Sequence, residues 1–257
     1  MNSVLDSIIA GVLEDVKARE ISVAQIKEQI DAAPIVRDAY ATLCAPGIQI
    51  IAEVKRSSPS KGVLASIIDP SGLARKYEEA GAAVISVLTE GRRFGGSTAD
   101  LVAVRNAVRL PVLRKDFTVT EFQVYETRAL GSDMILLIVA ALSNSQLRDY
   151  QSLSQELGLS VLVEVHDEAE LERAVSMNAQ IIGVNARNLK TLSIHEEVFT
   201  RLLPLIPDDR LKIAESGIAT RAQVEIVEEL GAKALLIGET LVRAGDPRIA
   251  INTLLGR

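Results

Sequence analysis

Eight apolar runs, each followed by a stretch of helical character or by the chain's end, constrain the fold of this sequence most strongly. The runs are "IQIIAEVK", "AVISVLTE", "VLRKDF", "DMILLIVA", "SVLVEVHD", "QIIGVNAR", "LKIAESG" and "ALLIGET". Apolar residues make up 48% of the chain and aromatic residues only 3%, a balance typical of strands that helices bury on both faces. Eight strand–helix units in 257 residues predict an α/β fold, a (β/α)₈ TIM barrel.

Helical stretches such as "PSGLARKYEEAGA" and "TRAQVEIVEELGA" separate the runs. Several end in a glycine that suits a helix C-terminus, namely Gly81, Gly131, Gly158 and Gly231. An open doubly wound sheet is the alternative fold, and it would need a Gly-rich phosphate turn after its first strand. The segment "EVKRSSPSKG" has no G-x-G-x-x-G pattern, so the barrel is favoured.

The residues before the first run have helical patterns. The segment "SVLDSIIAGVLEDVKARE" predicts a helix whose apolar stripe is formed by Val4, Ile8, Val12 and Val16. Ser22 and Gln25 form a capping box at the start of a second helix, and Pro34 suits the first position of a third. We expect a single barrel domain over residues 1–257, with residues 1–47 as an N-terminal helical extension docked on it.

Composition excludes several functional classes. The net charge is −6 with acids and bases interspersed, which argues against a nucleic-acid partner. The lone cysteine, Cys44, allows neither an internal disulfide nor a thiolate metal cluster. His166 and His195 lie on different segments, so we interpret both as hydrogen-bonded loop residues rather than metal ligands.

The N-terminal segment does not have the pattern of a targeting sequence. Asp6, Glu14 and Asp15 interrupt its apolar residues at helical spacing, which is unlike a signal peptide. No apolar run approaches the ~18 residues that suggest a membrane span. We expect a soluble cytoplasmic protein without a membrane partner.

Polar side chains recur where the predicted strands end. They are Glu53 and Lys55, Lys115, Glu164, Asn185 and Arg187, and Glu215. The carboxyl ends of barrel strands meet at one mouth, where the active site lies, so these acids and bases should converge. The small residues in "AESGI" and "IGET" resemble the phosphate site of such barrels. The pattern predicts an anionic, phosphorylated substrate and acid–base chemistry.

A glycine-flanked loop, "EGRRFGGS", follows the second run. Its glycines predict a mobile segment over the barrel mouth. Phe94 could give the site an apolar wall, or it could cover the barrel rim. The residues alone leave both interpretations open.

Several motifs together resemble the indole-3-glycerol phosphate synthase family of tryptophan biosynthesis. They are "IIAEVKRSSPSKG", "LRKDF", "GSDMILLI", "LVEVHD", "GVNARNLKT", "AESGI" and "IGETLVRAGDP". The match extends from the first strand to the last helix, and the family also carries a helical N-terminal extension. The resemblance implies a carboxy-lyase that closes the ring of 1-(2-carboxyphenylamino)-1-deoxy-D-ribulose 5-phosphate and then loses CO₂ and water. It implies a small-molecule phosphorylated substrate and neither cofactor nor metal, and we expect a monomer.

The resemblance also implies roles for individual residues. Lys115 matches the general acid of ring closure, and Glu164 matches the acid–base group of the later dehydration. Glu53 and Lys55 match a pair that orients and polarises the substrate.

Other residues match binding positions of the family. The implied substrate-binding residues are Ser58, Phe94, Phe117, Asn185, Arg187 and Leu189. The implied phosphate-binding residues are Lys55, Ser216, Gly217, Gly238 and Glu239. The sequence departs from common family patterns at two positions, because Ala186 replaces an asparagine and Arg93 replaces an aromatic residue. The second departure puts substrate packing on the Phe94 loop in question.

Two other functions compete with this interpretation. One is another phosphosugar barrel enzyme, such as phosphoribosylanthranilate isomerase, which would need an aspartate and a cysteine at strand ends. Cys44 instead precedes the first strand. The other is a non-catalytic barrel that binds a ribose phosphate. The intact set of Glu53, Lys55, Lys115 and Glu164 argues against it.

Overall fold

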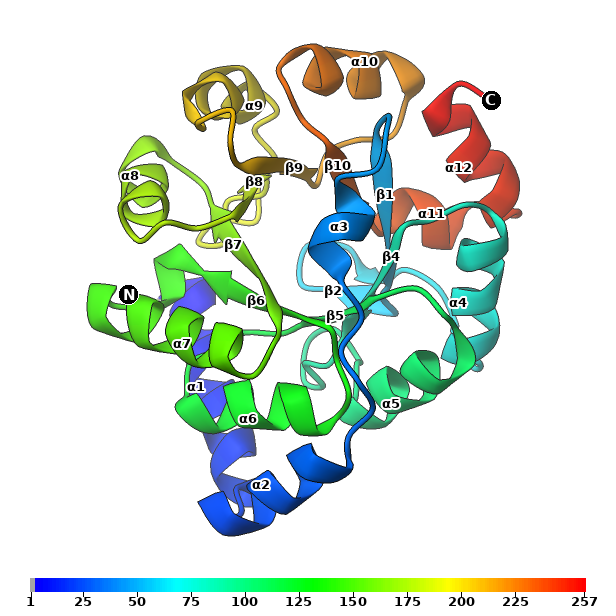
Figure 1. The fold of residues 1–257 in the computed structure, drawn as a ribbon. Helices are drawn as coiled ribbons and strands as arrows, with labels where there is room; N and C mark the ends of the chain where they lie inside the picture. The colour runs from blue at the N-terminus through cyan, green and yellow to red at the C-terminus, as the bar shows by residue number, and fades with distance from the viewer. Residues whose placement is uncertain (1–2) are drawn as a thin grey trace.

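The structure, a computed structural model, describes residues 3–257, so Met1 and Asn2 of the predicted extension lie outside the described residues. Eight parallel strands close into a barrel (Figure 1) in the order β1-β10-β9-β8-β7-β6-β5-β4. Their bounds are β1 Gln49–Val54, β4 Val84–Leu88, β5 Val112–Lys115, β6 Met134–Ile138, β7 Ser160–Val165, β8 Ile181–Asn185, β9 Leu211–Glu215 and β10 Ala234–Ile237. Each predicted apolar run contains one of them, so the predicted barrel is confirmed.

Helices form a ring outside the strands. They are α4 Pro70–Glu79, α5 Thr98–Ala107, α6 Glu121–Ala129, α7 Asn144–Glu156, α8 Glu168–Ser176, α9 Glu197–Leu202, α10 Arg221–Glu229, α11 Glu239–Arg243 and α12 Pro247–Leu255, with the 3₁₀ turns η1 Val139–Ala141 and η2 Leu203–Leu205. The four predicted glycine stops follow α4, α6, α7 and α10 with φ between 78° and 94°, the left-handed backbone of a helix C-terminus. A short hairpin, β2 Ser57–Ser58 with β3 Gly62–Val63, lies between β1 and α4.

The barrel register brings the strand-end polar residues together. Glu164 is the partner of Gly183 in the pairing of β7 with β8, and Asn185 is the partner of Glu215 in the pairing of β8 with β9. Every residue of β4 and β6 is buried, as expected for strands enclosed by helices. The strands therefore form a rigid support for the charged groups at their carboxyl ends.

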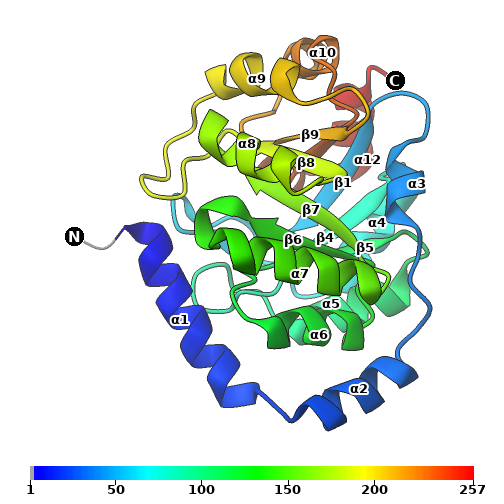
Figure 2. The same cartoon turned by 60° about the vertical axis from the view of Figure 1, so that its left-hand side comes forward.

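Three helices precede the barrel: α1 Val4–Arg19, α2 Val23–Ala32 and α3 Ala39–Leu43. Helix α1 lies beside the barrel end where the loops after the strands gather (Figure 2), and α3 lies across the opposite end. The buried face of α1 is formed by Leu5, Ile8, Gly11, Val12 and Val16. The predicted stripe is thus correct for Ile8, Val12 and Val16. Val4 is only partly buried, and in the first turn Leu5 lies on the buried face instead.

The predicted capping box is confirmed, because Ser22 accepts from the Gln25 N–H and the Gln25 side chain accepts from the Ser22 N–H. The predicted helix start at Pro34 is wrong, since residues 34–38 form no helix. Contacts with the barrel hold the segment in place. The Arg37 N–H donates to Asp133 Oδ1 at 2.7 Å, and its guanidinium donates to the Leu110 carbonyl at 2.6 Å. Among residues 3–257, no helix has both the length and the apolar character needed to cross a membrane.

Candidate active site

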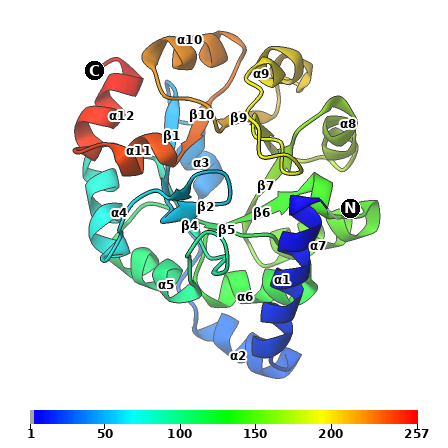
Figure 3. The same ribbon diagram turned by 180° about the vertical axis from the view of Figure 1, so that it is seen from behind.

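A cavity of about 450 Å³ opens at the carboxyl ends of the strands, the barrel end seen in Figure 3. All the predicted site residues except Ser58 line it: Glu53, Lys55, Phe94, Lys115, Phe117, Glu164, Asn185, Arg187, Leu189, Ser216, Gly217, Gly238 and Glu239. Ser58 lies in β2 with its hydroxyl buried and without a partner among the described residues. The cavity also contains Glu215, predicted as a strand-end acid, and residues without a predicted role, among them Lys61 and Arg243.

Lys115 and two carboxylates form the centre of the cavity. The Lys115 ammonium lies 2.8 Å from Glu164 Oε2 and 3.6 Å from Glu215 Oε2. Both carboxylates are 1% exposed. Burial alone would favour the neutral amine, but the charges of Glu164 and Glu215 outweigh it and raise the pKa of Lys115 above its ordinary value. Lys115 is therefore protonated at neutral pH and can donate a proton.

The two carboxylates differ in protonation. Burial opposes ionisation of Glu164, but the Lys115 ammonium and His166 lower its pKa below the ordinary value. Burial and the neighbouring Glu164 charge raise the pKa of Glu215 to about 8, because two adjacent carboxylates do not ionise equally. Near pH 7 the centre thus holds an ionised Glu164 and a largely protonated Glu215. The strand-end position of Glu215 marked it as an acid of the site, but nothing in the sequence revealed this asymmetry.

His166 supports Glu164 from the outer side. Its Nε2 lies 3.3 Å from Glu164 Oε1, and its Nδ1 lies 2.9 Å from Glu170 Oε2. Burial favours the neutral ring, but both carboxylates favour the imidazolium and raise the pKa of His166 to about 10. The interpretation of His166 as a hydrogen-bonded loop residue is confirmed for its contact with Glu170, whereas its contact with Glu164 was not anticipated.

Protein stability is expected to depend on pH through His166. Its pKa of about 10 in the folded protein exceeds the ordinary 6.5, so the native state retains a proton that the unfolded chain releases between these values. The free energy of unfolding should therefore fall as pH rises through this window. The pKa of Glu215 is about 8 in the folded protein and ordinarily 4.5. Its ionisation should therefore also lower the free energy of unfolding as pH rises between these two values.

Urea unfolding between pH 8 and 10 measures the contribution of His166 to the free energy of unfolding. This interval lies above the pKa of Glu215 and extends up to the pKa of His166. The His166→Asn variant should show a flatter decline than the wild type over this interval. Equal slopes for the two proteins would contradict the assignment.

Glu53 and Lys55 form an ion pair at the end of β1. Glu53 is 2% exposed, and Gly238 of the neighbouring β10 end lies close against it. A Cβ at Gly238 would stand 2.1 Å from Glu53 Oε2 and 2.9 Å from Lys55 Nζ. Because Gly238 has no side chain, the Glu53–Lys55 pair fits beside it.

The Gly238→Ala variant should displace the Glu53–Lys55 pair and lower kcat/KM by about 10- to 100-fold, since small displacements of catalytic groups have effects of this order. Steady-state kinetics of the purified variant check the prediction. Gly245→Ala is a matched control, because a Cβ there meets no atom within 4 Å. A kcat/KM of wild-type size in Gly238→Ala would show that the site tolerates the extra methyl group.

Phe94 and Phe117 form an apolar wall of the cavity. Their ring centroids lie 6.1 Å apart at a tilt of 40°. The carboxylate of Glu90 accepts from the N–H groups of Arg93 at 2.8 Å and Phe94 at 3.0 Å, which fixes the turn that carries Phe94. Of the two interpretations of Phe94, the structure supports a wall of the cavity.

The two departures from family patterns do not alter the cavity lining. Arg93 does not line the cavity, because its guanidinium donates to Ser7 Oγ of α1 at 2.7 Å. Ala186 is 2% exposed and borders a second cavity of about 470 Å³ instead. Phe94 lines the cavity, so the departure at Arg93 does not remove this aromatic surface from the site.

The loop after β8 reaches across the mouth. Asn185 Oδ1 accepts from the Arg187 N–H at 3.0 Å, and the Arg187 guanidinium donates to Ser60 Oγ of the β2–β3 turn at 2.9 Å. Arg187 thus joins the loops after β1 and β8. Its other guanidinium donors remain near the cavity, where an anionic group of a substrate can reach them.

The turns after β9 and β10 expose backbone to the cavity. Ser216 and Gly217 have φ of +65° and +79°, and such a left-handed backbone is uncommon for serine. Both residues line the cavity, and the backbone N–H groups of a turn can form a concavity that suits an anion. Cations that line the same cavity include Lys55, Lys61 and Arg243. The sequence gave no signal of a role for Lys61, in the β2–β3 turn, or for Arg243, at the end of α11.

Other chemistry-bearing residues lie elsewhere. Cys44 is a free, exposed thiol that ends α3, at the barrel end opposite the cavity, and it does not line the cavity. Within residues 3–257, no group of three or more His, Cys, Asp or Glu residues has the arrangement of a metal site.

Solved structures with a similar fold have low sequence identity to this chain. The 3-hexulose-6-phosphate synthase from Salmonella typhimurium superposes with a TM-score of 0.66 over 81% of this chain and 97% of that protein, at 14% identity. The N-acetylmannosamine-6-phosphate 2-epimerase from Clostridium perfringens gives a TM-score of 0.60 over 76% of this chain and 88% of that protein, at 15% identity. These likenesses show the barrel fold alone.

Sequence comparison identifies the family. The family model described as indole-3-glycerol phosphate synthase matches residues 5–254. Proteins with that name are 55% identical in Nocardioides sp., covering 99% of this chain and 98% of theirs, and 54% identical in Paenarthrobacter aurescens, covering 97% and 94%. On this match over nearly its whole length, the chain belongs to the indole-3-glycerol phosphate synthase family.

Proposed function

We propose that this member of the family performs the indole-3-glycerol phosphate synthase reaction in the strand-end cavity, with Lys115 as the general acid of ring closure. The substrate is 1-(2-carboxyphenylamino)-1-deoxy-D-ribulose 5-phosphate, and the products are indole-3-glycerol phosphate, CO₂ and water. One observation carries the assignment of Lys115. A protonated, nearly buried ammonium projects into the cavity with Glu164 and Glu215 beside it.

Ring closure requires the ring carbon that bears the carboxylate to attack the C2′ ketone. Negative charge develops on the ketone oxygen during this attack, and Lys115 donates its proton there. The ammonium also stabilises that charge before the proton moves. Loss of CO₂ then restores the aromatic ring.

Dehydration needs a proton for the departing hydroxyl and a base for the proton on the neighbouring carbon. We assign the acid–base role to Glu164, which is ionised in the free site and close enough to Lys115 to exchange a proton. Glu53 and Lys55 orient and polarise the substrate from β1. Glu215, largely protonated near pH 7, can donate a hydrogen bond to a substrate oxygen.

The remaining predicted residues bind the substrate. Arg187 and Asn185 border the cavity beside Leu189, while Phe94 and Phe117 provide an apolar surface for the substrate ring. Holding the flexible chain bent for attack is a proximity effect. Ser58 keeps its proposed binding role only if the β2–β3 hairpin moves toward the cavity when substrate binds.

The phosphate is proposed to bind the turns after β9 and β10, through the backbone of Ser216, Gly217, Gly238 and Glu239 with Lys55 nearby. Gly217→Val should raise KM more than it lowers kcat, since phosphate contacts are made equally in the ground and transition states. A Cβ there would stand 3.1 Å from Ile194 Cγ2, and the backbone φ of +79° disfavours a side chain. Steady-state kinetics test this, and an unchanged KM would mean that the phosphate binds elsewhere.

The proposal also includes the domain organisation, the oligomeric state and the location of the protein. We propose one domain over residues 1–257 with residues 1–47 as its extension, a monomer, and a cytoplasmic location. A non-catalytic ribose-phosphate-binding barrel is the competing function. Incubating the protein with the substrate and measuring indole-3-glycerol phosphate distinguishes the two, because a binding protein would form none.

A further inference from the structure

Two loops of the barrel mouth carry the aromatic wall. Residues 89–97 follow β4 and include Phe94, and residues 116–120 follow β5 and include Phe117. The rings lie 6.1 Å apart, so a shift of either loop changes the wall that both rings form.

Helix α1 holds the first of these loops. The Arg92 guanidinium donates to Asp15 Oδ2 and Oδ1 at 2.9 and 2.7 Å, and to Glu14 Oε2 at 2.8 Å. Arg93 reaches Ser7 of the same helix at 2.7 Å. Gly11 allows this close approach, because a Cβ on it would stand 3.2 Å from Arg92 Cδ.

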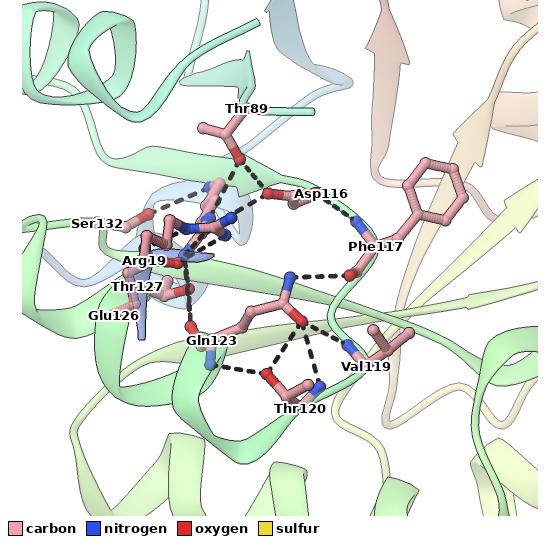
Figure 4. Close-up of polar contacts among 11 residues, drawn as sticks. Arg19, Thr89, Asp116, Phe117, Val119, Thr120, Gln123, Glu126, Thr127 and Ser132 are labelled. Carbon is pink, nitrogen blue, oxygen red and sulfur yellow. Dashed lines mark hydrogen bonds and ion pairs between the residues drawn. The ribbon is translucent and has the colours of Figure 1, made fainter. Parts of the chain in front are cut away.

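The same helix reaches the second loop through a chain of ion pairs. Arg19, at the end of α1, forms a bidentate pair with Glu126 of α6 at 2.7 and 3.1 Å. Glu126 accepts from Arg114 at 2.8 Å, and Arg114 donates to Asp116 at 3.1 Å. Asp116 in turn accepts from the Phe117 N–H at 2.8 Å. Figure 4 shows Arg19, Glu126, Asp116 and Phe117 along this path.

Arg114 is the buried link of this chain. It is 1% exposed and also donates to Thr89 Oγ1 at 3.1 Å and Thr127 Oγ1 at 3.2 Å, and Thr89 donates to Asp116 at 2.5 Å. Successive strand side chains point to opposite faces, so Arg114 faces α6 while Lys115 faces the cavity. The network therefore fixes the strand end that carries Lys115, together with the start of both loops.

We propose that α1 acts as a clasp that sets the position of Phe94 and Phe117 through Arg92 and through the Arg19–Glu126–Arg114–Asp116 chain. Arg19 and Asp15 are then positioning residues, which touch no substrate. This inference rests on the proposed binding of the substrate ring against the two phenylalanines. A purely stabilising role is the competing explanation. The Arg92–Asp15 pair is exposed on both sides and adds little stability, and the buried Glu126 still pairs with Arg114 when Arg19 is removed.

Arg19→Met tests the proposal. We expect kcat/KM to fall on the order of 10-fold with a melting temperature within a few degrees of the wild type, because loop misplacement affects reaction geometry more than stability. Arg19→Lys should recover part of the loss. Lys17→Met, which removes a cation from an exposed position in the same helical turn, is the matched control and should match the wild type.

A double-mutant cycle shows whether Arg19 acts through the aromatic wall. In a Phe117→Leu background, Arg19→Met should lower kcat/KM much less than it does alone, because the two changes disturb one element. If the two single-variant losses in kcat/KM multiplied in the double variant, as expected for independent sites, the proposal would be overturned. An Arg19→Met variant with a lowered melting temperature and an unchanged kcat/KM would also overturn it. Wild-type turnover in the same assay separates these outcomes from a failure of the proposed function.

Discussion

Lys115→Ala is expected to fold, bind substrate and lose about 10²- to 10⁴-fold in kcat, the usual contribution of a positioned general acid. The wild-type ammonium lies 2.8 Å from Glu164 and 3.6 Å from Glu215 within the cavity. Its removal leaves the ketone oxygen without a proton donor, whereas the phosphate turns after β9 and β10 are untouched. Steady-state kinetics and calorimetric titration with substrate give kcat and affinity separately.

Turnover, and not stability, distinguishes this role from a structural one, because both roles lower the melting temperature when Lys115 is removed. Without Lys115, Glu164 and Glu215 lose their shared cation while 1% exposed, so both should bind protons more readily and the melting temperature should fall most at alkaline pH. A lysine that only neutralises these carboxylates would lower the melting temperature and leave kcat within a few-fold. A folded variant with most of its kcat would contradict the assignment.

Glu164→Gln should also lose about 10²- to 10⁴-fold in kcat, but at a later step. Glutamine keeps the shape of the side chain and a hydrogen bond to Lys115, while it cannot accept a proton. Ring closure and loss of CO₂ still have Lys115 as acid, so in a single turnover CO₂ should appear faster than indole-3-glycerol phosphate. Equal rates for the two products would remove Glu164 from the dehydration step.

Glu170→Gln is the matched control for that experiment. Glu170 contacts His166 Nδ1 at 2.9 Å, on the side away from Glu164, and it borders the second cavity rather than the first. Its substitution should lower kcat far less than Glu164→Gln does. A loss of equal size would mean that the carboxylate–histidine chain acts as one unit.

The barrel and its strand-end acids and bases were predictable from sequence, because both depend on local patterns. Buried strands appear as continuous apolar runs. The residues at the carboxyl end of each run lie at one face of the barrel, independently of how the helices pack. This is why Glu53, Lys115, Glu164 and Asn185 could be placed at one end of the barrel before the structure was known.

The contacts that sequence did not reveal join distant segments. In the sequence, Arg114 is a basic residue within "LRKDF" and Arg93 is one that precedes Phe94. In the structure Arg114 links β5 to α6, and Arg93 binds α1. The extended segment after Pro34 follows from its contacts with Asp133 and Leu110. The opposite protonation of Glu164 and Glu215 depends on a distance across the barrel that no spacing along the chain encodes.

The proposed mechanism requires one orientation of the substrate between Lys115 and the β9–β10 turns. A crystal structure with the substrate analogue whose C2′ ketone is reduced to an alcohol would show this orientation. We expect the C2′ hydroxyl within about 2.7–3.2 Å of Lys115 Nζ, the phosphate at the backbone of Gly217 and Gly238, and the aromatic ring against Phe94 and Phe117. A phosphate bound beside Lys115, with the ring toward Ser216, would contradict it.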